Sequence, residues 1–134
     1  MDKLIIRKYE SKDSNQLFDL IKREGIEWTY WQGENWAKYL IALAECINYL
    51  LFEDEILCGY IRCRNDAGFG IYILDLLVDN AYRGNEYGRL LMEKVCHDHP
   101  DDYIFVASDV DPYYEKLGYK KEGTIFALQK GKYD

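Results

Sequence analysis

The run Arg83-Gly84-Asn85-Glu86-Tyr87-Gly88 has the residue types and the spacing of an anion-binding loop. It lies between an apolar run and a helical pattern. A helix that begins just after a strand offers unpaired N–H groups and the positive end of its dipole, which bind phosphate. Glycine lets a ligand approach the backbone, and Arg83 adds a positive charge. The spacing is neither a full Walker loop nor a full dinucleotide fingerprint, so a turn whose glycines serve geometry alone stays open.

Two titratable side chains are candidates for proton transfer. Tyr114 lies in the run Tyr-Glu-Lys-Leu-Gly-Tyr, and its hydroxyl could act as a general acid or could be the hydrogen-bonded tip of a packing residue. Asp75 interrupts the apolar run Ile71–Val78, where a lone carboxylate is costly unless it is paired or functional. A general base and a structural hydrogen bond are both open for Asp75. Ser108 and Asp109, after the next predicted strand, could line the same pocket.

Aromatic side chains are dense at Trp28, Tyr30 and Trp31, beside Glu27. They could form a hydrophobic plug between two helices. Alternatively, they could form a wall of an acceptor pocket, where aromatic faces with nearby carboxylates suit a cation.

The elements that must position these residues follow from the apolar pattern. Ile71–Val78 predicts a strand buried on both faces. After Gly88, one face of an amphipathic helix is marked by Leu91, Met92, Val95 and Cys96. Arg89 and Glu93 lie four residues apart on the other side and can pair.

The rest of the chain predicts further strands and helices around this unit. Strands are expected at Leu4–Tyr9, Ile47–Phe52, Ile56–Arg64, Tyr103–Ala107 and Thr124–Gln129. Helices are expected after a cap at Ser11 or Asp13 with a stop at Gly25, from Glu34, and from Asp111 to Gly118. The order β-α-α-β-β-β-α-β-α-β predicts one α/β domain, residues 1–134, with helices on the faces of a mixed sheet.

Composition narrows the class of protein. The hydrophobic fraction of 49% excludes disorder as the main state, and a net charge of −7 disfavours nonspecific binding to nucleic acid. We find neither an apolar run long enough for a membrane span nor a signal peptide at Met1, and we expect a cytoplasmic protein. Four cysteines without a Cys-x-x-Cys pair predict buried reduced thiols. His97-Asp98-His99 is interpreted as the end of a helix, and we expect no metal site.

The loop and the Tyr114 run together, at this spacing, resemble the GNAT superfamily of N-acetyltransferases. The resemblance extends to the order of elements over essentially the whole chain. It implies a mostly antiparallel sheet, acetyl-CoA as cofactor and direct attack by a primary amine. It places the cofactor against the loop Arg83–Gly88, against Leu77 and Val78 of the central strand, and near Ser108. The amide of Val78 would face the reacting oxygen, and Tyr114 would protonate the leaving thiolate.

Glu86 departs from the family pattern, which has a glycine there. We expect its carboxylate in the first helical turn, where it would repel phosphate by on the order of 1 kcal/mol unless it points to water or pairs with a cation. Glycine at such a helical position would cost up to about 1 kcal/mol of helix stability. Glu86 therefore keeps open a CoA-binding module without turnover. A transferase of a longer acyl group is a second alternative, which the depth of the pocket decides. The acceptor is expected to be a small cationic amine or a protein amino group, and a homodimer through an exposed final strand is open.

Overall fold

The computed structural model describes residues 3–128 and is organised around one five-stranded sheet. The strands follow the order β1 (Leu4–Lys8), β2 (Ile47–Glu53), β3 (Ile56–Asn65), β4 (Ile71–Val78) and β5 (Ile104–Val106). The first four strands pair antiparallel, whereas β5 runs parallel to β4. The predicted mixed, mostly antiparallel sheet is confirmed.

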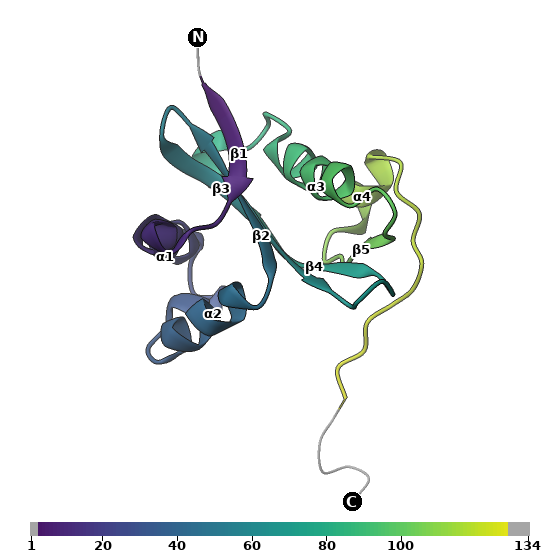
Figure 1. Ribbon diagram of the computed structural model, residues 1–134, viewed down its shortest axis with the longest axis horizontal. Coiled ribbons are helices and arrows are strands. Elements are labelled where there is room, and N and C mark those ends of the chain that lie inside the picture. The colour runs from purple at the N-terminus through teal and green to yellow at the C-terminus, as the bar shows by residue number, and fades with distance from the viewer. Residues whose placement is uncertain (1–2, 129–134) are drawn as a thin grey trace, which may run out of the picture.

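Helices cover both faces of the sheet, as predicted (Figure 1). On one side lie α1 (Ser14–Glu24) and α2 (Asn35–Ala44), and on the other lie α3 (Tyr87–Asp98) and α4 (Asp111–Lys116). Short 3-10 turns occur at η1 (Ser11–Asp13), η2 (Thr29–Trp31) and η3 (Asn80–Tyr82). No helix among residues 3–128 is long and apolar enough to cross a membrane.

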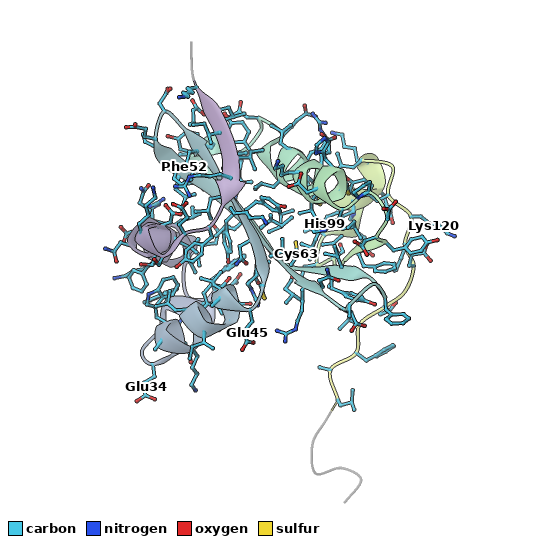
Figure 2. The ribbon with its side chains drawn as sticks, viewed as in Figure 1. Glu34, Glu45, Phe52, Cys63, His99 and Lys120 are labelled. Carbon is cyan, nitrogen blue, oxygen red and sulfur yellow. The ribbon has the colours of Figure 1, made fainter. Side chains whose placement is uncertain are left out.

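The sheet separates two hydrophobic cores. The core under α1 and α2 contains Leu17, Leu20, Ile21, Tyr39, Leu43, Leu50, Phe52, Leu57, Tyr60 and Leu77. The core under α3 contains Tyr49, Leu51, Cys58, Ile61, Cys63, Ile71, Ile73, Leu91, Met92 and Val95. Figure 2 shows Phe52 on the α1 side and Cys63 on the opposite side. Side chains of consecutive residues in a strand point to opposite faces of the sheet, so each strand can contribute residues to both cores.

Both ends of α1 form where the sequence places them. Asp13 is the N-cap of α1, although its carboxylate binds Arg7 and the amide of Glu10 rather than the helix. Gly25 ends α1 with a φ of 108°, a backbone conformation that favours glycine. On α3, Arg89 and Glu93 pair at 2.6 Å between Nη1 and Oε1, as predicted.

The strand β4 differs from the prediction of burial on both faces. Tyr72 and Leu74 are exposed, while Ile71, Ile73, Asp75 and Leu77 are buried. Across the ladder, Arg62 pairs with Asp75 but Cys63 pairs with Ile73, so Leu74 is one extra residue in β4. Such a β-bulge changes which face each following side chain points to. Ile73 therefore joins the α3 core, and Asp75 points to the α1–α2 side.

Two other expectations need correction. The cysteine prediction holds for Cys58 and Cys63, but Cys46 is half-buried and Cys96 is exposed, because the buried face of α3 is Gly88, Leu91, Met92 and Val95. The predicted final strand does not form over residues 124–128, and Gln129 lies outside the described residues. A strand needs a partner for its backbone groups, and residues 124–128 have none within the described part of the chain.

Candidate functional site

The parallel strands β4 and β5 separate halfway along β4. They pair only from Ile71–Ile104 to Ile73–Val106, whereas β4 stays paired with β3 up to Val78. Asp79 donates its amide to Cys58 at 2.7 Å, and N–H groups alternate between the two sides of a strand. The amide of Val78 must therefore point away from β3, to the side from which β5 has diverged. The geometry leaves a backbone donor at the end of β4 for an outside acceptor.

The loop after β4 leads directly into α3. Asp79 caps η3 by accepting the amide of Ala81 at 3.0 Å, and Gly84 follows with a φ of 91°. Asn85 donates its side-chain amide to the carbonyl of Tyr82 at 3.0 Å. β4 is thus followed by a loop that contains η3 and then by α3, which is the strand–loop–helix arrangement expected from the sequence.

Glu86 is not in the first helical turn, which corrects the expectation for this residue. It is the N-cap of α3, and its backbone is left-handed with a φ of 63°. Its carboxylate is exposed and accepts from Arg89 Nη2 at 3.0 Å. The positive charge of Arg89 offsets the repulsion that the Glu86 carboxylate would exert on a phosphate. Glycine suits position 86 because the backbone there is left-handed.

Gly88 lies under the hydroxyl of Tyr113, which links α3 to α4. A Cβ atom at Gly88 would come within 2.8 Å of Tyr113 Oη, so any other residue here would push that side chain away. The missing side chain lets the Tyr113 hydroxyl lie directly against the first turn of α3. The unpaired N–H groups at the start of α3 are the donors that a phosphate-bearing group would use, and the residues present fit one.

Arg83 and Tyr87 hold the loop to neighbouring elements. Arg83 donates to the carbonyl of Val78 at 3.0 Å and to Glu24 at the end of α1 at 2.6 Å. Tyr87 donates to Glu53 at the end of β2 at 2.6 Å. Glu24 neutralises the charge of Arg83, and the two bonds of Arg83 fix the loop to α1 and β4.

Tyr114 of α4 is half-buried on the α3 side of the sheet, against the α3 core. Its ring packs edge-on against Tyr113, with centroids 5.0 Å apart, and stacks with Tyr119. Within residues 3–128 its hydroxyl has no hydrogen-bond partner. Burial raises the pKa of Tyr114, so the phenol stays protonated at neutral pH and keeps a proton to donate. Before α4, Ser108 is exposed, and its hydroxyl accepts the amide of Val110 at 3.0 Å.

Asp75 lies at the centre of a buried polar network. It forms an ion pair with Arg62 of β3, and its second oxygen accepts from Tyr30 Oη at 2.8 Å. Tyr39 of α2 donates to the same carboxylate at 2.6 Å and lies 2.7 Å from the hydroxyl of Tyr60. Burial, with the nearby carboxylate, raises the pKa of both Tyr30 and Tyr39, which keeps them donors. The carboxylate is therefore fully engaged by a cation and two phenols.

The partners of Asp75 were not identified from the sequence. Arg62 is a lone cation in the buried part of β3, and Tyr39 was not singled out on its helix. One signal was available: Arg62 and Asp75 are charged residues in adjacent predicted strands of an apolar sheet. The rings of Tyr30 and Tyr39 stack with centroids 4.1 Å apart, and the Arg62 guanidinium lies over the Tyr39 ring at 5.1 Å. Two stacked aromatic rings thus lie against the charged pair at the centre of the network.

The aromatic segment packs between α1 and the sheet. Trp28 and Trp31 contact the α1–α2 core, and Trp31 donates its indole N–H to the carbonyl of Gly25 at 3.1 Å. Tyr30 also borders a depression of about 320 Å³. That depression is lined by Thr29, Tyr30, Asn35, Lys38, Tyr39, Ala42 and Arg62. Its lining residues include two cations and no carboxylate.

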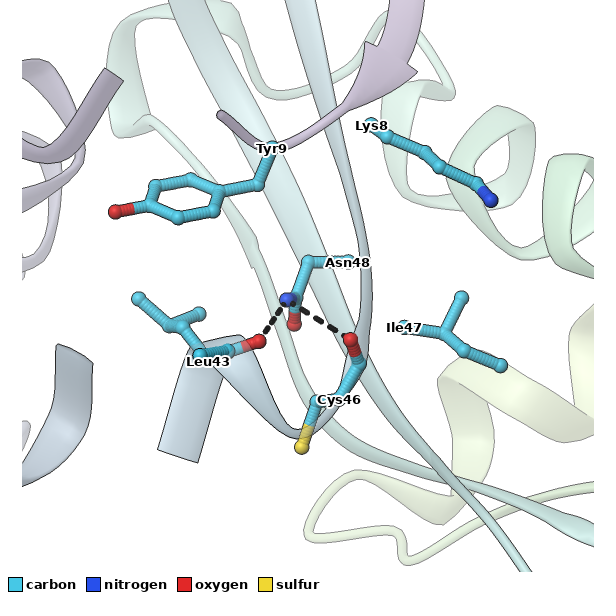
Figure 3. A pocket seen from close by; sticks show the side chains of 7 residues that line it. Lys8, Tyr9, Leu43, Cys46, Ile47 and Asn48 are labelled. Atoms are coloured by element: carbon cyan, nitrogen blue, oxygen red, sulfur yellow. Dashed lines mark hydrogen bonds between the residues drawn. The ribbon is translucent and has the colours of Figure 1, made fainter. Parts of the chain in front are cut away.

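The predicted catalytic residues lie on opposite faces of the sheet. Asp75 belongs to the α1–α2 side, while Tyr114 packs against the α3 core, so the two side chains are not in contact. A second depression, of about 220 Å³, lies between Tyr9 and the end of α2 and contains none of the predicted site residues (Figure 3). Among residues 3–128 no cluster of histidine, cysteine, aspartate and glutamate could hold a metal ion.

Comparison with known proteins places this arrangement in a family. Residues 35–121 match the acetyltransferase (GNAT) domain model. The chain therefore belongs to the GNAT acetyltransferase family, an enzyme class whose cosubstrate is acetyl-CoA. Over 75 residues the chain is 32% identical to a histone acetyltransferase, TAP1, of Glycine max and 31% identical to GCN5-related N-acetyltransferase 2, chloroplastic, of Arabidopsis thaliana. These matches cover 52% of this chain but only 32% and 29% of those proteins, so the chain spans about a third of their length.

Solved structures of low sequence identity share the fold. A GNAT-family acetyltransferase, SP0256, of Streptococcus pneumoniae superposes with a TM-score of 0.73 at 21% identity, covering 96% of this chain and all of the other. An acetyltransferase of Trypanosoma brucei gives a TM-score of 0.72 at 21% identity, covering 95% and 99%. A predicted acetyltransferase of Clostridium acetobutylicum, solved with acetyl-CoA, gives 0.69 at 18% identity, covering 95% and 96%.

Proposed function

We propose that this chain transfers the acetyl group of acetyl-CoA to a primary amine. The observation that carries the proposal is the separation of β4 from β5, together with the loop that leads from β4 into the first turn of α3. The two features supply a backbone donor at Val78 and helix N–H groups after Gly84 within one short stretch of chain. Acetyl-CoA, when bound, supplies the activated acetyl thioester.

The backbone of residues 83–88 would hold the pyrophosphate, and the amide of Val78 would bind the carbonyl oxygen of the acetyl group. Both are fixed groups on rigid elements, so they stabilise charge without having to reorganise. Tyr114 would donate its phenolic proton to the departing sulfur, a role that its raised pKa and half-buried position support.

Asp75 is better suited to positioning than to proton abstraction. Its carboxylate is already bound by Arg62, Tyr30 and Tyr39, so it has little free acceptor capacity for the proton of an amine. We assign it the role of fixing η2 on β4, which sets the wall of the acceptor side. The proton of the amine would then leave through water.

The charges beside Tyr30 bear on the acceptor. Lys38 and Arg62 line the depression there. Asp75 neutralises Arg62, so Lys38 supplies the positive charge that disfavours a polycationic amine. Among small amines, one that also carries a carboxylate or phosphate suits this depression better than the cationic amine expected from the sequence. A protein amino group next to acidic residues would meet the same requirement.

Thiol release from acetyl-CoA, measured over a panel of amines, tests the proposal. The panel should pair each polyamine with amino acids and amino sugar phosphates of similar size. We expect turnover with an acceptor that bears an anionic group, and a raised melting temperature with acetyl-CoA alone. Stabilisation by acetyl-CoA without thiol release for any amine would instead favour a CoA-binding module. The absence of both effects at millimolar acetyl-CoA would overturn the proposal.

A further inference from the structure

The side chain of Tyr113 points its oxygen atom at the first turn of α3. Its Oη atom lies 2.8 Å from the position that a Cβ atom at Gly88 would take, whereas the ring atom Cζ lies 3.9 Å from it. A methyl carbon of Leu76 in β4 lies 3.8 Å from the same position. The hydroxyl is therefore close both to the start of α3 and to the strand that ends beside it.

The short helix α4 holds the Tyr113 ring in this place. The amide of Tyr113 donates to the carbonyl of Val110 at 3.0 Å, and the ring packs edge-on against Tyr114 with centroids 5.0 Å apart. Lys121 reaches the carboxylate of Asp111, in the first turn of α4, at 3.3 Å. Backbone, ring and charge contacts thus fix the direction in which the phenol points.

The hydroxyl of Tyr113 is available as a donor. Within residues 3–128 it has no hydrogen-bond partner, and the residue is 40% exposed, so a ligand can reach it. Burial raises the pKa of Tyr113, while Arg89 lowers it and Glu86 raises it by smaller amounts. The phenol therefore keeps its proton at neutral pH.

Backbone donors of α3 lie next to this hydroxyl. The N-cap residue Glu86 makes no side-chain cap, because its carboxylate pairs with Arg89. The amide of Leu90 donates to the carbonyl of Glu86 at 3.1 Å, and the amides of Gly88 and Arg89 precede this bond, so they have no partner within the helix. An anion at this turn would meet N–H groups of α3 and the O–H group of α4 together.

The glycine at position 88 is required by the hydroxyl rather than by the ring. A Cβ atom 2.8 Å from Oη would overlap it, so the hydroxyl would have to move. Separations of 3.8 Å from Leu76 and 3.9 Å from the ring atom Cζ are ordinary van der Waals contacts. Gly88 and the Tyr113 hydroxyl are therefore a matched pair.

We propose that the Tyr113 hydroxyl donates a hydrogen bond to the pyrophosphate of acetyl-CoA, beside the backbone amides of Gly88 and Arg89. The inference rests on the proposed function, because it adds a ligand to the same cofactor site. A hydrogen bond to an ionised phosphate oxygen is stronger than one between neutral groups. Tyr113 is thus a cofactor-binding residue, while the adjacent Tyr114 acts on the departing sulfur.

Calorimetric titration with acetyl-CoA tests the contact. Tyr113→Phe should raise the Kd about tenfold, because one hydrogen bond to a charged group is lost, and should leave kcat at saturating acetyl-CoA unchanged. Tyr119→Phe is the matched control, since Tyr119 is also 40% exposed and follows the same helix. Acetyl-pantetheine lacks the pyrophosphate, so its kcat/KM should be the same for wild type and Tyr113→Phe. An equal loss with acetyl-pantetheine would contradict a pyrophosphate contact.

A double-mutant cycle tests the pairing of the hydroxyl with Gly88. In the wild type, Gly88→Ala should raise the Kd for acetyl-CoA by a similar factor, because the new Cβ displaces Oη. In the Tyr113→Phe background the same substitution should leave the Kd unchanged and raise the melting temperature, since the overlap is gone and alanine favours the helix. Independent losses that add in the double variant would overturn the pairing.

The same titrations separate this inference from the proposed function. A wild type that does not bind acetyl-CoA would overturn both. Binding by the wild type with an equal Kd for Tyr113→Phe would overturn the Tyr113 contact alone. Tighter binding by Tyr113→Phe would show that the hydroxyl obstructs the phosphate, and it would also overturn the contact.

Discussion

Tyr30 donates a hydrogen bond of 2.8 Å to Asp75, which lies 45 positions further along the chain. This bond joins η2, in the segment between α1 and α2, to the bulged strand β4. The same carboxylate also neutralises Arg62 and accepts from Tyr39. The segment η2 and the central strand are thereby one connected unit.

Asp75→Asn should destabilise the fold by about 3 kcal/mol, because it leaves the buried guanidinium of Arg62 without its counter-charge. Tyr30→Phe removes only one hydrogen bond and should cost about 1 kcal/mol. Urea unfolding gives both values. In steady-state kinetics we expect Tyr30→Phe to raise KM for the amine more than it lowers kcat. A stable Asp75→Asn protein with a hundredfold lower kcat and an altered pH profile would instead identify Asp75 as a general base.

Glu86→Gly should stabilise the protein by about 1 kcal/mol, because a residue with a side chain is strained in the left-handed conformation that Glu86 adopts. Glu86→Gln keeps that strain and should give no such gain. Because the carboxylate of Glu86 is exposed and paired with Arg89, we expect the Kd for acetyl-CoA to be the same for wild type and Glu86→Gln at low salt. Thermal unfolding measures the change in stability, and calorimetric titration measures the Kd for acetyl-CoA. Several-fold tighter binding by the glutamine variant would show that the charge faces the ligand.

Tyr114→Phe should lower kcat about a hundredfold while leaving the Kd for acetyl-CoA unchanged, because only the donated proton is lost. Tyr119→Phe is the control, since its ring stacks on Tyr114 and its hydroxyl has no assigned role. Since burial raises the pKa of Tyr114, activity should not fall on the alkaline side below pH 10. An unchanged kcat for Tyr114→Phe with an active acceptor would make Tyr114 a packing residue.

The stability of the fold should depend on Asp98 in acid. The hydrogen bond from Tyr49, with contributions from His97 and Lys94, lowers the pKa of Asp98 to about 2. Since this pKa is lower in the folded than in the unfolded protein, the carboxylate stabilises the fold above pH 4, and that contribution is lost as the pH falls toward 2. Asp98→Asn should therefore be less stable than wild type at pH 7 and equally stable near pH 2. Urea midpoints measured from pH 7 to pH 2 give the comparison.

The loop and the helix after it could be predicted from consecutive residues. Local sequence is enough to predict the glycine positions 84 and 88 and the apolar face of α3, because backbone freedom and helix amphipathicity depend on residues within one or two turns. The Arg89–Glu93 pair and the stop at Gly25 are local for the same reason. Even here Glu86 was misplaced, because a shift of one residue at a helix end decides between a helical and a left-handed backbone.

The sequence by itself determined the class of fold, the turn between β4 and α3, and Tyr114 as a candidate acid, because each depends on short-range pattern and composition. The tertiary structure decided what surrounds Asp75 and left residues 124–128 without a strand partner. A single bulge at Leu74 turns Asp75 to the face where Tyr30, Tyr39 and Arg62 meet, and an inserted residue of this kind leaves no mark on an apolar run. Whether a strand-forming segment becomes a strand depends on a partner edge far away in sequence, which local propensity does not contain.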